Sequence, residues 1–210
     1  MGINGIFMQL SHNLLEKLKQ EPGLIRVFTH ARYVSESDLM QGKGIFLYYK
    51  EFDEIKADIP LVIAEGRNEE LDIDKAWHIM HFILTNDSSW KALQLPFLVY
   101  ENSDSDGLSL VNAVMGGTPI EEYDRDFTPV RYLTNDEVKQ VAEALPGITK
   151  ADLKKRLNQA IILNIDIYKY TVWLGEDDEL LEDLIAIKQE ITEYYQDAAK
   201  KGNAMLLYLS

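Results

Sequence analysis

The C-terminal segment, residues 176–210, restricts the possible folds more than any other part of the chain. Its apolar side chains recur at intervals of three and four and form one buried helical stripe: Leu180, Leu184, Ile187, Ile191, Tyr194 and Ala198. The acidic run 176–179 precedes this helix, Lys200 and Lys201 close it, and Gly202 supplies its stop. The apolar run AMLLYLS that follows is expected to be a buried strand near the N-terminal strand.

The remaining segments add strands and helices in an irregular order. INGIFMQL (3–10) reads as a strand, Ser11 is placed to cap a helix that ends at Gln20, and residues 24–33 read as a second helix. Further strands are predicted at residues 96–101, 108–115 and 129–133. Residues 34–70 are the least clear: GIFLYYKEF fits a strand or a helix, and IPLVIAEG is a short apolar run ended by Gly66.

Two further helices are predicted from capping patterns at their N-termini. Thr134 and Glu137 have the spacing of a capping box, and the segment TKAD at 149–152 repeats that pattern. Strands at both ends, helices between them and no regular alternation predict an α+β fold. We expect a single compact domain over residues 1–210, with helices packed in layers on a small mixed β-sheet.

The amino-acid composition excludes several kinds of functional site and partner. The chain has no cysteine, which excludes disulfides, thiolate zinc sites and cysteine nucleophiles. The net charge is −14: residues 1–100 carry 10 basic and 14 acidic groups, and residues 101–210 carry 11 and 21. Such a surface is unsuited to nucleic acid and would attract a basic protein partner, but acidity that only serves solubility is the favoured explanation. With no signal peptide and no membrane-spanning run, we expect a cytoplasmic protein away from membranes.

The segment LDIDKAWHIMHFILT (71–85) contains the most specific group of polar residues. In a helix that begins after Asp72, the residues Asp74, His78, His81 and Thr85 share one narrow polar stripe on an apolar element. Asp74 is four residues from His78, so it could orient the ring, raise its pKa and create a general base. The alternative is a pair of core histidines satisfied by the backbone or by an acid. One helix offers too few ligands for a metal, and we assign no metal or cofactor.

Two further segments complete a candidate pocket. The glycines Gly116 and Gly117 in AVMGGTP could bring backbone amides close to a ligand, and a plain turn is the alternative. Arg131, followed by Tyr132, stands just before a capped helix, where it could hold an anion or form a structural ion pair. The phosphate loop, GxGxxG, GxSxG, HExxH and EF-hand patterns are missing from the sequence.

The sequence resembles the YfbM-like family of bacterial proteins, a domain of unknown function. The resemblance rests on MGINGIFMQLS, LDIDKAWHIMHFILT, the glycine pair at 116–117, PVRYLTNDEV and YYQDAAKKGNAMLLYLS, and it extends over the whole chain. It implies a layered α/β domain and no established activity. The chain departs from the family at Asp126-Phe127-Thr128 and at Val130, which replaces a small residue, so a pocket there could differ in shape.

These observations leave two functional hypotheses. The first is a non-catalytic binding protein that engages a protein partner or a small ligand, because familiar catalytic patterns are missing and the second half is acidic. The alternative is a hydrolase-like or transferase-like enzyme in which Asp74 orients His78 and in which His81 or Arg131 stabilises negative charge. No residue is assigned as catalytic, and the oligomeric state is left open.

Overall fold

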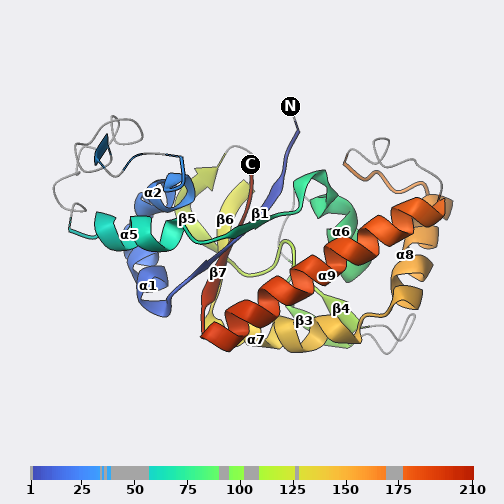
Figure 1. The fold of residues 1–210 in the computed structure, drawn as a ribbon. Helices are drawn as coiled ribbons and strands as arrows, with labels where there is room; N and C mark the ends of the chain where they lie inside the picture. The colour runs from blue at the N-terminus through green and yellow to red at the C-terminus, as the bar shows by residue number, and fades with distance from the viewer. Residues whose placement is uncertain are drawn as a thin grey trace.

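The computed structural model describes residues 2–33, 35, 37–38, 57–89, 95–101, 109–125, 128–168 and 177–210. The last strand, β7, lies at the centre of a five-stranded sheet with the order β2-β1-β7-β6-β5 (Figure 1). The strands are β1 (Gly5–Leu10), β2 (Glu70–Asp72), β5 (Thr118–Arg125), β6 (Thr128–Leu133) and β7 (Ala204–Leu209). The chain combines helices with this sheet, so the predicted α+β class is confirmed. Each pairing among the described strands is antiparallel, whereas a mixed sheet was expected.

Helices cover both faces of this sheet. The helices are α1 (His12–Gln20), α2 (Leu24–His30), α5 (Ile59–Gly66), α6 (Trp77–Thr85), α7 (Asn135–Ala144), α8 (Lys150–Ile162) and α9 (Asp177–Lys201). Two short 3₁₀ turns occupy Asp74–Ala76 and Leu145–Gly147, and β3 (Val99–Glu101) pairs with β4 (Ser109–Val111) as a separate ribbon. Figure 1 shows α1, α2 and α5 on one side of the sheet and α6 to α9 on the other.

The central strands are apolar on both faces because both faces are covered. Phe7 pairs with Leu207, and both belong to the core beneath α6 to α9. The neighbouring pair, Ile6 and Tyr208, belongs to the core beneath α1, α2 and α5. All six residues of β1 and of β7 are buried, which explains why these strands read as continuous apolar runs rather than alternating ones.

The capping signals in the sequence are confirmed. The Ser11 hydroxyl accepts a hydrogen bond from the Leu14 backbone N–H, and both capping boxes form with their reciprocal bonds. Helix α9 ends where Gly202 takes a φ of 70°. Its buried stripe is shifted slightly from the predicted one, because Tyr195 is fully buried while Tyr194 is only partly so.

Other segments differ from the sequence prediction. The apolar run before Gly66 forms helix α5 with Pro60 in its first turn, and β5 was not anticipated. The predicted helix from residue 73 is interrupted, because Asp74–Ala76 forms a 3₁₀ turn and only then does α6 begin. The alternatives considered for GIFLYYKEF concern residues outside the described part of the chain. Within the described residues, no helix is both long and apolar enough to cross a membrane.

Candidate functional site

Helix α6, which carries both candidate histidines, is buried along its whole length. Trp77 at its first position is fully buried, and its indole Nε1–H donates to the carbonyl oxygen of Ile3 at 2.9 Å. The His78 ring stacks on the Trp77 indole at a centroid distance of 5.0 Å. The polar side chains of this helix are therefore inside the protein and have to find their partners there.

The ring of His78 is held between two backbone groups. Its Nδ1 accepts a hydrogen bond from the backbone N–H of Tyr168 at 2.8 Å, and its Nε2 lies 2.8 Å from the carbonyl oxygen of Ser88. A backbone N–H can only donate, so Nδ1 is unprotonated and the neutral ring donates through Nε2. Burial lowers the pKa of His78, although Ser88, Asp166 and Asp87 act in the opposite direction.

The predicted partnership between Asp74 and His78 is wrong. Asp74 adopts a φ of 48° inside the 3₁₀ turn, so it does not continue the helical spacing that would place it beside His78. Its exposed carboxylate is 2.5 Å from the Lys75 ammonium, and its backbone N–H donates to the Asp72 carboxylate at 2.7 Å. The predicted rise in the His78 pKa is wrong for the same reason, since burial outweighs the nearby acids.

His81 is buried as completely as His78, with 1% of each residue exposed. Among the described residues neither ring nitrogen has a hydrogen-bond partner, and burial lowers the pKa of His81 to about 4. Thr85 donates to the His81 carbonyl oxygen at 2.6 Å and accepts from the Asp87 backbone N–H, so its hydroxyl serves the end of the helix. In the described residues no three His, Asp or Glu side chains are grouped so that they could hold a metal ion.

The glycine pair allows close packing of the loop between β4 and β5. A Cβ atom on Gly116 would collide with the carbonyl oxygen of Asn112, and one on Gly117 would collide with that of Tyr132. Gly117 also has a φ of 89°, which disfavours other residues. Its carbonyl oxygen accepts a hydrogen bond from Arg131 Nη1 at 2.9 Å, so the loop and the arginine position each other.

Arg131 and Tyr132 follow each other on β6 and face opposite sides of the sheet. Arg131 pairs with Leu207 of the core beneath α6 to α9, whereas Tyr132 pairs with Leu206 on the other face. Tyr132 lines a different cavity with Lys19, whose ammonium lies 5.3 Å from the tyrosine ring centroid. The residues predicted to form one pocket are therefore separated. Arg131 and Tyr132 lie on opposite faces of the sheet, and the histidines are buried around α6.

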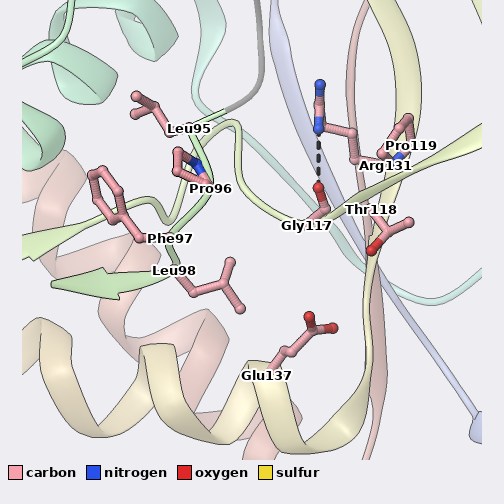
Figure 2. A pocket seen from close by; sticks show the side chains of 9 residues that line it. All are labelled: Leu95, Pro96, Phe97, Leu98, Gly117, Thr118, Pro119, Arg131 and Glu137. Atoms are coloured by element: carbon pink, nitrogen blue, oxygen red, sulfur yellow. Dashed lines mark hydrogen bonds between the residues drawn. The ribbon is translucent and has the colours of Figure 1, made fainter.

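A cavity of about 310 Å³ lies beside Arg131. Its lining combines an apolar segment, the start of β5 and two charged side chains: Leu95, Pro96, Phe97, Leu98, Gly117, Thr118, Pro119, Arg131 and Glu137 (Figure 2). Only 5% of Arg131 is exposed, and burial lowers the pKa of its guanidinium, which nevertheless stays protonated at neutral pH. This is a concave site with an apolar wall and a few fixed polar groups, as small-ligand sites usually are.

Comparison with known proteins places this fold in a family. The model of a domain of unknown function (DUF1877) matches residues 1–208. The chain belongs to the DUF1877 family. Its structure is similar to a crystal structure of YfbM, a protein of unknown function from Escherichia coli, with a TM-score of 0.54 and 17% sequence identity over 99% of both chains. No curated protein matches the chain.

The family resemblance inferred from the sequence is thus confirmed, and the likeness to YfbM concerns the fold. In this DUF1877 protein the cavity brings together only Gly117 and Arg131 of the predicted site residues. Glu137 was recognised only as a capping residue and residues 96–98 only as the start of a strand, and Leu95 was not singled out. Their shared position at one cavity depends on the packing of α7 against β6 and against the separate ribbon of β3 and β4, which the local sequence does not reveal.

Proposed function

We propose that this DUF1877 protein binds a small organic molecule in the cavity beside Arg131. The observation that carries the proposal is a buried guanidinium and a carboxylate lining one concave space opposite Leu95, Pro96, Phe97 and Leu98. Charged side chains that line a concave site with an apolar wall are typical of small-ligand pockets. The volume of about 310 Å³ suits a metabolite-sized molecule.

A binding role has more support than the catalytic alternative. A general base at His78 needs a free ring nitrogen and a carboxylate that orients it. Both ring nitrogens of His78 instead lie at hydrogen-bonding distance from backbone groups, and Asp74 is engaged with Lys75. Of the two binding versions, the small-ligand version is supported by a cavity, whereas a basic protein partner is supported by the net charge of −14 alone.

The test is a titration of isotope-labelled full-length protein with a set of small carboxylates, amines and neutral amides, followed by backbone amide NMR. We expect at least one compound to shift the amides of Leu98, Gly117, Thr118 and Glu137 in a saturable way. Tyr132→Phe is the matched control, because Tyr132 lies next to Arg131 and faces the other side of the sheet. The proposal fails if no compound shifts the cavity amides, or if the shifts gather around Tyr132 and Lys19.

A further inference from the structure

A second cavity, of about 330 Å³, lies where the C-terminal end of α9 meets β1 and the segment before β2. Of the described residues, none lines both this cavity and the one beside Arg131. Every side chain in its lining carries polar atoms, and besides Tyr194 these residues are Gln9, Asn68, Glu69, Asp197, Lys201 and Asn203. A lining of this kind holds a ligand mainly through hydrogen bonds.

The buried amide of Gln9 holds two of these polar groups in place. Only 6% of Gln9 is exposed. Its Nε2 donates to Asp197 Oδ2 at 3.0 Å and to the Tyr194 carbonyl oxygen at 3.3 Å, and its Oε1 accepts from Asn203 Nδ2 at 3.2 Å. A carboxylate and a carbonyl can only accept, so they fix the orientation of the amide. Asp197 and Asn203 are therefore separated by the width of one amide group.

Both groups held by Gln9 have an oxygen atom that the protein does not use. Asp197 Oδ2 accepts from Gln9 and from the Lys201 ammonium at 2.5 Å, whereas Oδ1 has no hydrogen bond to any described residue. Within the described ranges Asn203 Oδ1 has none either. Lys201 donates once to Asp197 and carries further N–H groups. The cavity thus combines two oxygen acceptors with a neighbouring ammonium donor.

The charges around these atoms favour a neutral ligand. The contacts with Lys201 and Gln9 hold the pKa of Asp197 below its usual value, so the carboxylate is ionised at neutral pH. A cation that approached it would also approach Lys201. An anion would meet Asp197, Glu69 and a protein whose net charge is −14. A neutral ligand has to donate to the oxygens and accept from the ammonium, and hydroxyl groups do both.

We propose that this second cavity binds a neutral polyhydroxylated molecule of the hexose type. One hydroxyl donates to Asp197 Oδ1 and accepts from Lys201 Nζ, and a second hydroxyl donates to Asn203 Oδ1. Nearby hydroxyls of one sugar ring can contact both groups, because Gln9 holds Asp197 and Asn203 close together. The inference concerns a different cavity from the one beside Arg131 and does not depend on the proposed function.

The test is a titration of isotope-labelled full-length protein with D-glucose, D-galactose and D-mannose, followed by backbone amide NMR. We expect at least one of these sugars to shift the amides of Asn68, Asp197 and Asn203 in a saturable way. Its 2-amino counterpart carries a positive charge and its uronic-acid counterpart a negative one. Both should bind at least about tenfold more weakly than the neutral sugar.

Three variants test the assigned contacts. Asp197→Asn should weaken binding of the sugar about tenfold, because a neutral amide replaces the charged acceptor. Asp183→Asn, the same change at an exposed position of α9 outside the cavity, is the matched control and should leave binding unchanged. Lys201→Gln should tighten binding of the amino sugar, because the repelling cation is removed.

Four results would overturn the inference. The first is that none of the three sugars shifts the cavity amides, and the second is that a charged counterpart binds more tightly than the neutral sugar. The third is equal sugar affinity in Asp197→Asn and Asp183→Asn, which would remove the carboxylate from the site. The fourth is an unchanged affinity for the amino sugar in Lys201→Gln, which would show that the ammonium does not select a neutral ligand.

Discussion

His78 and Tyr168 are joined by a hydrogen bond across ninety residues of sequence, in which the Tyr168 backbone N–H donates to His78 Nδ1 at 2.8 Å. The other ring nitrogen lies 2.8 Å from the Ser88 carbonyl oxygen, so one side chain connects α6 to two loop segments. Protonation of Nδ1 would destroy the bond to Tyr168, and the burial that lowers the pKa of His78 favours the neutral form that this bond needs. The ring of His78 therefore helps to hold these two segments against α6.

The first prediction concerns His81 and the pH dependence of stability. The pKa of His81 falls from 6.5 in the unfolded chain to about 4 in the folded protein, because the ring is buried. The unfolded state then binds more protons between these values, so this contribution to stability is complete above 6.5 and is lost as the pH falls toward 4. His81→Leu removes the titrating group and an imidazole that has no partner among the described residues.

The measurement is the free energy of unfolding in urea for wild type and His81→Leu across this pH range. The stability of the variant relative to wild type should rise by about 2 kcal/mol between about pH 8 and about pH 5. Groups that both proteins share cancel in this comparison. A difference that stays constant with pH would mean that the pKa of His81 is the same in the folded and unfolded states, and that its environment is more polar than the structure indicates.

The second prediction concerns Trp77, which is fully buried. Trp77→Ala should lower the free energy of unfolding by about 3–5 kcal/mol, because it opens a large cavity and leaves the Ile3 carbonyl oxygen without its indole donor. Ile162→Ala is the control: 80% of Ile162 is exposed, so its loss should change stability by less than about 0.5 kcal/mol. Equal losses for the two variants in urea unfolding would contradict this description of the core.

Features specified by neighbouring residues were predictable from the sequence, and features specified across the sheet were not. The caps at Ser11, Thr134 and Thr149 depend on the next three residues, so their patterns are visible locally. The His78 partners are backbone groups at Ser88 and Tyr168, and backbone groups leave no mark in a sequence.

Two local departures from regular structure account for the other differences. The positive φ of Asp74 changes the direction of the chain just before α6, so counting helical positions from residue 73 put a surface carboxylate on an internal stripe. Strand β5 has the sequence TPIEEYDR and lies at the edge of the sheet. An edge strand has a neighbouring strand on one side only and is more exposed to solvent than a central strand. It therefore lacks the apolar pattern by which buried strands are recognised.

The third prediction uses the two capping boxes as a matched pair. Thr134→Ala and Thr149→Ala each remove a side-chain cap, and each should cost about 1 kcal/mol in urea unfolding. Only Thr134 also holds the carboxylate of Glu137 at the cavity. Thr134→Ala should therefore weaken the binding of a small molecule in the cavity while Thr149→Ala leaves it unchanged, and equal affinities in the two variants would show that the box does not position a ligand contact.

The last prediction compares two glycines that share a left-handed backbone and differ in their surroundings. Gly117 has a φ of 89° and Gly202 a φ of 70°, so alanine is strained at both positions. A Cβ atom on Gly202 would meet no other atom nearby, and Gly202→Ala should cost only about 1–2 kcal/mol. A Cβ atom on Gly117 would collide with the Tyr132 carbonyl oxygen, which is held in the sheet.

Gly117→Ala must therefore displace the loop from β6 as well as bear the backbone strain. Its loss in urea unfolding should exceed that of Gly202→Ala by about 1–3 kcal/mol. Because the Gly117 carbonyl oxygen accepts from Arg131 Nη1, the same displacement should shift the Arg131 side-chain NMR signals and weaken ligand binding. Gly202→Ala, at the end of α9, should leave both unchanged. Equal losses of stability in the two variants, with the Arg131 signals unmoved, would show that the loop can accept a side chain at Gly117 and does not position the arginine.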